Sequence, residues 1–270
     1  MDKRDSGNAL PDAYAPADVA RRVEAVAVAK AAMPPVPLAT LGVLAGAFIA
    51  FGAMFFTLVA SDPTLGFAVK RVLGGAVFSL GLVLVVVGGA ELFTGNNLIA
   101  MGWADGKVAT GRLLRNWVIV WPANFVGAAA TAAMVHASGI LDLGAGDMAR
   151  TAAAIATAKA ALGWEEAILR GVLCNVLVCL AVWLTMAARE VSGKILAILF
   201  PITAFVALGF EHSVANMYFM PLGWLLGADG VTLAAIAHNL LFVTLGNVLG
   251  GGVLVALVYW LVYLSPFGRR

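Results

Sequence analysis

The chain has 270 residues, of which 62% are hydrophobic and 12% are charged, and its formal net charge at pH 7 is +2. Water-soluble globular proteins carry about 25% charged residues, so this composition excludes a soluble globule and indicates a protein embedded in a membrane. The small net charge, with basic residues spread along the chain, does not favour nucleic-acid binding.

Six membrane spans are predicted after a polar start. Residues 1–36 form an N-terminal segment without an apolar stretch of signal-peptide length, and Val19, Val23 and Val26 recur there at the spacing of an amphipathic helix. Residues 37–266 form the membrane domain, and residues 267–270 form a short tail. We expect the connection 138–166 to be a long loop, since its glycines discourage a continuous helix. The spans are predicted at 38–60, 72–104, 113–137, 168–188, 195–227 and 231–264.

The second and the fifth of these spans are interrupted. Residues 89–97 break the second span, and residues 209–216 break the fifth. Non-helical backbone at membrane depth is tolerated only where protein or a water-filled cavity covers it, and paired interruptions of this kind mark solute sites. The sequence therefore predicts a protein that moves a solute across a membrane.

The distribution of Lys and Arg predicts the orientation. With six spans both termini lie on one side of the membrane, and most Lys and Arg residues fall on that side. Because positive loops stay in the cytoplasm, we expect both termini to be cytoplasmic and the chain to lie in the cytoplasmic (inner) membrane.

The two halves of the membrane domain repeat, approximately as 37–137 and 168–264. Each half has three spans, an odd number, so the second copy is predicted to be inverted in the membrane. The asparagines of the third and sixth spans are interpreted as structural. The pairs that carry the repeat are Gly42 and Gly171, Glu91 and Glu211, Asn96 and Asn216, Asn116 and Asn239, Asn124 and Asn247, and Gly127 and Gly250.

The breaks suggest an anion site. Half-helix N-termini that point inward carry partial positive charge, and Thr94 adds a hydroxyl group. His212 is a candidate functional residue because an ionisable group at membrane depth is costly; its alternative role is a structural hydrogen bond between helices. Glu91 and Glu211 are interpreted mainly as structural, as acceptors for freed backbone N–H groups or as partners that orient a histidine.

Three motifs in this order resemble signature segments of the formate/nitrite transporter family. They are ELFTGNN at 91–97, NVLVCLAVW at 175–183 and GFEHSVANM at 209–217, and the resemblance covers residues 37–264. It implies an all-α, aquaporin-like fold of six spans, five protomers in a ring, and one pore in each protomer.

The resemblance also implies site residues and a substrate. The string at 92–99 is similar to the formate-type branch, so we expect formate, with nitrite and hydrosulfide as alternatives, and no cofactor. The implied pathway residues are His212, Thr94, Asn175, Glu211, Asn216 and, on the outer side, Lys159. The implied constrictions are formed by Phe78, Leu82, Leu92 and Phe205.

Proton coupling is the expected solution to the cost of moving an anion through apolar constrictions. An unpaired carboxylate in a low-dielectric medium is strongly disfavoured. Lys159 is expected to gather the anion, and then either His212 binds a proton or the anion takes one and crosses as the neutral acid. We hypothesise that His212 couples transport to protons.

Two functions of other classes stay open. One is a membrane-embedded enzyme that uses His212 with Glu211 or Glu91 as acid and base, although the chain lacks paired histidines at metal-ligand spacing and a recognisable nucleophile motif. The other is a neutral-solute channel of aquaporin type, although the paired Asn-Pro-Ala motifs are missing.

Overall fold

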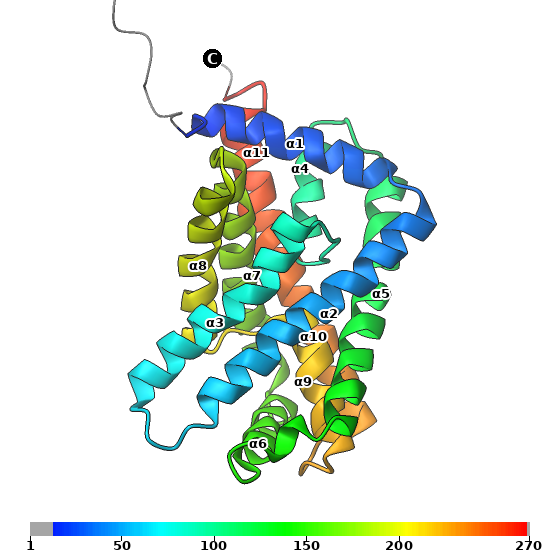
Figure 1. Cartoon of the computed structure of the whole chain (residues 1–270). Helices are drawn as coiled ribbons and strands as arrows, with labels where there is room; N and C mark the ends of the chain where they lie inside the picture. The colour runs from blue at the N-terminus through cyan, green and yellow to red at the C-terminus, as the bar shows by residue number, and fades with distance from the viewer. Residues whose placement is uncertain (1–12, 269–270) are drawn as a thin grey trace, which may run out of the picture.

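The computed structural model describes residues 13–268, and helices make up most of this part of the chain (Figure 1). The start of the predicted N-terminal segment, the last two residues of the predicted tail, and Lys3, Arg4, Arg269 and Arg270, which contributed to the predicted orientation, lie outside the described residues. The α-helices are α1 Pro16–Ala32, α2 Pro35–Ala60, α3 Phe67–Gly88, α4 Ile99–Ala104, α5 Thr110–Ala137, α6 Asp147–Ala160, α7 Trp164–Ala187, α8 Val191–Leu208, α9 Ser213–Leu225, α10 Leu233–Val248 and α11 Val258–Tyr263.

Six helical segments of the described chain are long and apolar enough to cross a membrane, as the sequence predicts. They are α2, α3, α5, α7, α8 and the continuous stretch Leu233–Tyr263, in which the π-helix Leu249–Leu257 joins α10 to α11. This last stretch has 31 residues. At about 1.5 Å per residue it is longer than the roughly 30 Å hydrocarbon core, so it extends beyond the bilayer.

The connection after α5 differs from the expected loop. Gly139, Gly144 and Gly146 have positive φ and keep the chain irregular as far as Gly146. The next residues are rich in alanine, the strongest helix former, and they form α6. A 3-10 helix, Ile140–Asp142, precedes it. The glycines therefore delay the helix and do not prevent it.

Helices α1 and α6 lie across opposite ends of the bundle (Figure 1). The buried face of α1 includes Val19 and Val23, and packs against the bundle. Glu24 is buried, and its carboxylate lies 2.5 Å from Lys107 Nζ in the α4–α5 loop. Burial raises the pKa of this carboxyl, and the hydrogen bond from Lys107 opposes the rise. Arg115 donates to the carbonyls of Ala31, in the last turn of α1, and of Met33, the residue that follows the helix, which fixes this end of α1.

The two halves of the bundle are built alike and run in opposite directions. In Figure 1, α3 starts at the α6 end and α8 starts at the α1 end. Gly127 of α5 sits where a Cβ would be 1.9 Å from the Val43 carbonyl oxygen, and at Gly250 a Cβ would be 2.3 Å from that of Val172. These glycines are 123 residues apart and the valines 129, the offsets of the sequence repeat. Equivalent helix pairs thus cross at equivalent glycines, which confirms the inverted repeat.

Candidate functional site

The first break follows α3. Gly89 has φ +84, so helix α3 ends there, and the chain stays non-helical until the 3-10 helix Gly95–Leu98 that precedes α4. The freed N–H of Phe93 donates to Asn124 Oδ1 at 2.9 Å. The Asn124 amide group donates to the carbonyls of Gly42 at 2.7 Å and Glu91 at 2.9 Å. One buried asparagine of α5 therefore holds the break.

The second break is held in the same way. Gly209, with φ +75, ends α8, and the N–H of Ser213 donates to Asn247 Oδ1 at 2.9 Å. Asn247 in turn donates to the carbonyls of Gly171 and Glu211, at 2.8 and 3.0 Å. The expectation that Glu91 and Glu211 accept the freed backbone N–H groups is wrong for Phe93 and Ser213. These N–H groups donate to asparagines of neighbouring helices.

The two glutamates bind lysines and asparagines instead. Glu91 lies 2.7 Å from Lys30 Nζ and accepts from Asn96 Nδ2 at 2.7 Å. Glu211 lies 2.8 Å from Lys159 Nζ and accepts from Asn216 Nδ2 at 2.6 Å. In both halves an asparagine of the following span completes the network. Asn116 accepts from Asn96 and donates to the Lys30 carbonyl, and Asn239 accepts from Asn216 and donates to the Lys159 carbonyl.

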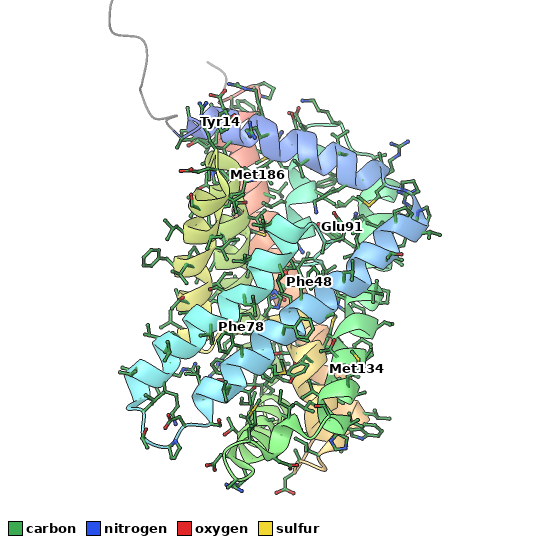
Figure 2. All side chains as sticks on the ribbon, in the orientation of Figure 1. Tyr14, Phe48, Phe78, Glu91, Met134 and Met186 are labelled. Atoms are coloured by element: carbon green, nitrogen blue, oxygen red, sulfur yellow. The ribbon has the colours of Figure 1, made fainter. Side chains whose placement is uncertain are left out.

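Lys30 is the residue of this network that the sequence reasoning missed. It lies on α1, outside the predicted repeats, and Figure 2 shows its partner Glu91 below that helix. The signal was present in the sequence, since 159 − 30 = 129 is the offset that pairs Gly42 with Gly171. The repeat therefore includes α1 and α6, each of which brings one lysine over one break.

Thr94 and His212 meet between the two breaks. Thr94 Oγ1 and His212 Nε2 are 2.9 Å apart, and both residues are buried. The N–H of Ala215 donates to His212 Nδ1 at 3.0 Å, so Nδ1 is an acceptor and carries no proton. In the neutral ring the proton is then on Nε2, which donates to Thr94. The hydrogen of the Thr94 hydroxyl is then available to donate to another acceptor.

Two cavities approach this contact from opposite ends. The α6-side cavity, about 220 Å³, is lined by His212, Lys159 and Glu211, and also by Phe78 and Phe205. The His212 ring stacks on Phe205, with 5.8 Å between the ring centroids, and Phe205 meets Phe78 edge to face. Phe78 lies closer to the α6 end than Glu91 in Figure 2.

The α1-side cavity, about 310 Å³, is lined by Lys30, Glu91, Leu82 and Leu92. The four residues named as constrictions are thus divided between the cavities, two phenylalanines on one side and two leucines on the other. All four are at most 3% exposed.

Asn175 lies beside the centre and outside both cavity walls. Its Nδ2 donates to the carbonyls of Asn247 at 2.7 Å and Thr94 at 3.3 Å, and Cys179 also donates to the Thr94 carbonyl. Asn175 thus positions the backbone that carries the Thr94 hydroxyl. Both cysteines are buried and free, as the apolar sequence around them suggests. Within residues 13–268 no three His, Cys, Asp or Glu side chains are placed to hold a metal ion.

Six spans in two inverted halves, with one cavity opening toward each end and a polar contact between them, define a membrane transport protein. Comparison with known proteins gives the particular family. The family model "Formate/nitrite transporter" matches residues 17–261. The chain belongs to the formate/nitrite transporter family.

Its relatives are similar over nearly their whole length. A probable formate transporter of Methanothermobacter thermautotrophicus is 44% identical over 268 residues, covering 93% of this chain and 97% of the relative. The formate channel FocA of Escherichia coli is 35% identical, covering 94% and 95%. A solved structure of a pentameric formate channel with formate bound superposes with a TM-score of 0.79 at 35% identity, covering 86% of this chain and 98% of that one.

Proposed function

We propose that this protein conducts formate through a path inside each protomer, from the α6-side cavity past Thr94 and His212 to the α1-side cavity. The observation that carries the proposal is the buried Thr94–His212 contact, which lies between two cavities that are lined mainly by apolar side chains. Formate is favoured because relatives at 44% and 35% identity are named for formate.

Each of the two cavities is lined by one lysine, whose positive charge is compensated by a glutamate. Lys159 and Lys30 attract the anion to the two cavities, but each is tied to a glutamate. A free ammonium group at this depth would hold an anion strongly, whereas conduction needs binding that is weak enough for release. Pairing each lysine with a glutamate therefore weakens anion binding, as conduction requires.

The centre supplies hydrogen bonds, and the substrate carries the proton. With Nδ1 of His212 occupied by the Ala215 N–H, a proton can be added to the ring only if that bond at the start of α9 breaks. The anion instead takes a proton from hydronium in a cavity, which leaves water and formic acid, and the acid crosses between Phe205 and Leu92. The Thr94 hydroxyl donates to it on the way. Of the two proton routes expected from the sequence, this geometry favours the neutral acid, and transport increases as the pH falls.

The protein is proposed to act as a ring of five protomers in the cytoplasmic membrane, with both ends of the chain in the cytoplasm. The structural relative with bound formate is described as pentameric. Large apolar side chains are exposed along α3 and α8, including Phe67 and Phe200, and these faces suit lipid or a neighbouring protomer. In this orientation α6 lies on the outer side and α1 on the inner side.

The test is uptake of labelled formate by purified protein in liposomes, measured across a range of pH. We expect saturable uptake that rises at lower pH and falls strongly in His212→Phe, because the substitution removes the donor to Thr94. Formate flux equal to that of the wild type in that variant would show that the proposed site is wrong.

The same vesicles separate the alternatives. Faster uptake of nitrite or hydrosulfide than of formate reassigns the substrate within the family. Chemical conversion of formate without its accumulation in the vesicles would indicate an enzyme, and glycerol-induced swelling would indicate a neutral-solute channel.

A further inference from the structure

The two cavities differ in charge, although equivalent segments build their walls. The α1-side cavity has one lysine and one glutamate as its charged lining residues. The α6-side cavity has the equivalent pair, Lys159 and Glu211, and in addition Arg71 and Arg170. Positive charge therefore exceeds negative charge at one end of the path only.

The repeat does not require these arginines. The carbonyl of Arg170 accepts from the N–H of Glu211 at 3.2 Å, and the carbonyl of Leu41 accepts from the N–H of Glu91 at the same distance. Arg170 and Leu41 thus occupy equivalent positions, and Leu41 lines the α1-side cavity. Arg71 corresponds to Val191 by the offset of 120 residues that relates the two glutamates. One half of the molecule therefore has guanidinium groups at these two positions, and the other half forms the same architecture without them.

Within the described part of the chain, Arg71 is hydrogen-bonded to backbone carbonyls and not to a carboxylate. Its Nε and one terminal nitrogen donate to the carbonyls of Ala207 and Val206, at 2.8 and 3.0 Å, at the end of α8. Among residues 13–268, no carboxylate forms an ion pair with Arg71. The other cations of this cavity are paired, Lys159 with Glu211 and Arg170 with Glu166. The guanidinium of Arg71 is therefore the uncompensated charge of the α6-side cavity.

We propose that Arg71 and Arg170 form an anion-binding site in the α6-side cavity, which captures a small monovalent oxyanion before it reaches the Lys159–Glu211 pair. The inference rests on the proposed transport of such an anion. Guanidinium groups match the two oxygens of a carboxylate or nitrite ion, and their charge raises its local concentration. Since Leu41 and Val191 replace them in the other half, transport from the α6 side saturates at a lower substrate concentration than transport from the α1 side.

Right-side-out and inverted membrane vesicles from the same cells present the two ends of the path separately. The α2–α3 loop lies at the α6 end in Figure 1, so a cysteine introduced by Thr64→Cys reports with an impermeant thiol reagent which vesicles expose that end, since the native cysteines are buried. Initial formate uptake is then measured against concentration from each side. We expect a half-saturation concentration roughly three- to tenfold lower from the α6 side.

The variants assign this difference to the arginines. Arg170→Leu installs the residue of the equivalent position and should raise the half-saturation concentration from the α6 side alone, as should Arg71→Gln, whereas Arg170→Lys should retain most of the effect. Lys70→Leu is the matched control, because it removes one charge from the same end of α3 without touching the cavity lining. The salt dependence of uptake should also be steeper from the α6 side.

The outcomes are separable. If wild-type vesicles transport formate with equal half-saturation from both sides, or if Arg170→Leu and Arg71→Gln behave like Lys70→Leu, the arginine site is overturned while the proposed function stands. If wild-type vesicles transport no formate, nitrite or hydrosulfide, the proposed function itself fails.

Discussion

The α1 half and the α6 half of this protein share one frame and differ at the centre. Each half holds its break with an asparagine and closes it with a Lys–Glu–Asn network. The offset of 120 residues that pairs the two glutamates also pairs Leu92 with His212 and Thr94 with Val214, so the polar contact at the centre comes from one unmatched residue of each half. The duplicated residues support the fold, whereas Thr94 and His212, which form the central contact of the proposed pathway, differ between the copies.

Because the two halves are equivalent, we expect large and similar losses of stability when either of the asparagines that bind the breaks is replaced. Asn124→Ala and Asn247→Ala each remove one acceptor and two donor contacts from a buried site. Because buried groups left unpaired cost about 1–3 kcal/mol each, we expect each variant to lose several kcal/mol of stability and much of its folded yield. Thermal unfolding in detergent measures this. A large loss for one variant and none for the other would contradict the equivalence of the two breaks.

The lysines test whether equivalent networks have equal weight. Lys159→Met leaves the buried Glu211 carboxylate without its cation and should cost about 3 kcal/mol, whereas Lys30→Met should cost less, because the Lys30 side chain is 25% exposed and that of Lys159 is 14%. Unfolding temperatures of the two variants give the comparison. Adding Glu211→Gln to Lys159→Met should recover part of the loss, and no recovery would mean that the lysine acts in another way.

The contact between Thr94 and His212 can be tested by replacing Thr94 with the residue found at the equivalent position of the other half. Thr94→Val installs the residue found at the equivalent position, Val214, with similar volume and without the hydroxyl. We expect formate flux in liposomes to fall about tenfold, because a missing hydrogen bond to a permeating acid costs about 1.4 kcal/mol. We also expect a loss of about 1–3 kcal/mol of stability, because the buried His212 Nε2–H loses its acceptor. Val182→Thr, which adds a hydroxyl group to a valine in the wall of the α1-side cavity, is the matched control. It should leave flux near the wild-type level. Equal flux in Thr94→Val and the wild type would remove the hydroxyl from the pathway.

The smallest expected effect concerns the attachment of α1. Burial raises the pKa of Glu24 above its ordinary value of 4.5, so the docked helix binds a proton more tightly than the detached helix does. Attachment is therefore strongest below the ordinary value and weakens as the pH rises through the raised pKa. Hydrogen exchange of α1 amides, corrected for intrinsic rates, should show less protection at high pH, and Glu24→Gln should flatten this dependence. Protection that grows with pH in the wild type would contradict the sign.

Much of the fold was predictable from the sequence for a simple reason. Stretches of about 20 apolar residues have one stable arrangement in a bilayer, so the spans and their two interruptions could be read from the hydropathy pattern. Helix α6 was missed because its alanine-rich stretch follows three glycines and is too short and too polar to be a span. Lys30 precedes the first span, so the repeat of the membrane spans does not include it.

Most of the site required the packed structure. The motifs predicted that Thr94 and His212 belong to the pathway, but not that His212 Nδ1 is occupied by the Ala215 N–H, which decides where its proton lies. Nor did they predict that asparagines, and not glutamates, receive the freed backbone groups. Partners of this kind come from helices that are distant in the sequence, and hydrogen bonding depends on which group arrives within about 3 Å.

Hydropathy, periodicity and long motifs were sufficient to establish the membrane setting, the six spans, the inverted repeat and the family, because each of these is written along the chain. The residues that face each cavity, the partner of each lysine and the excess of positive charge in the lining of the α6-side cavity became known only from the packed helices. The physical reason is that charge compensation depends on distance in space, and distances between helices are set by how the two halves pack together.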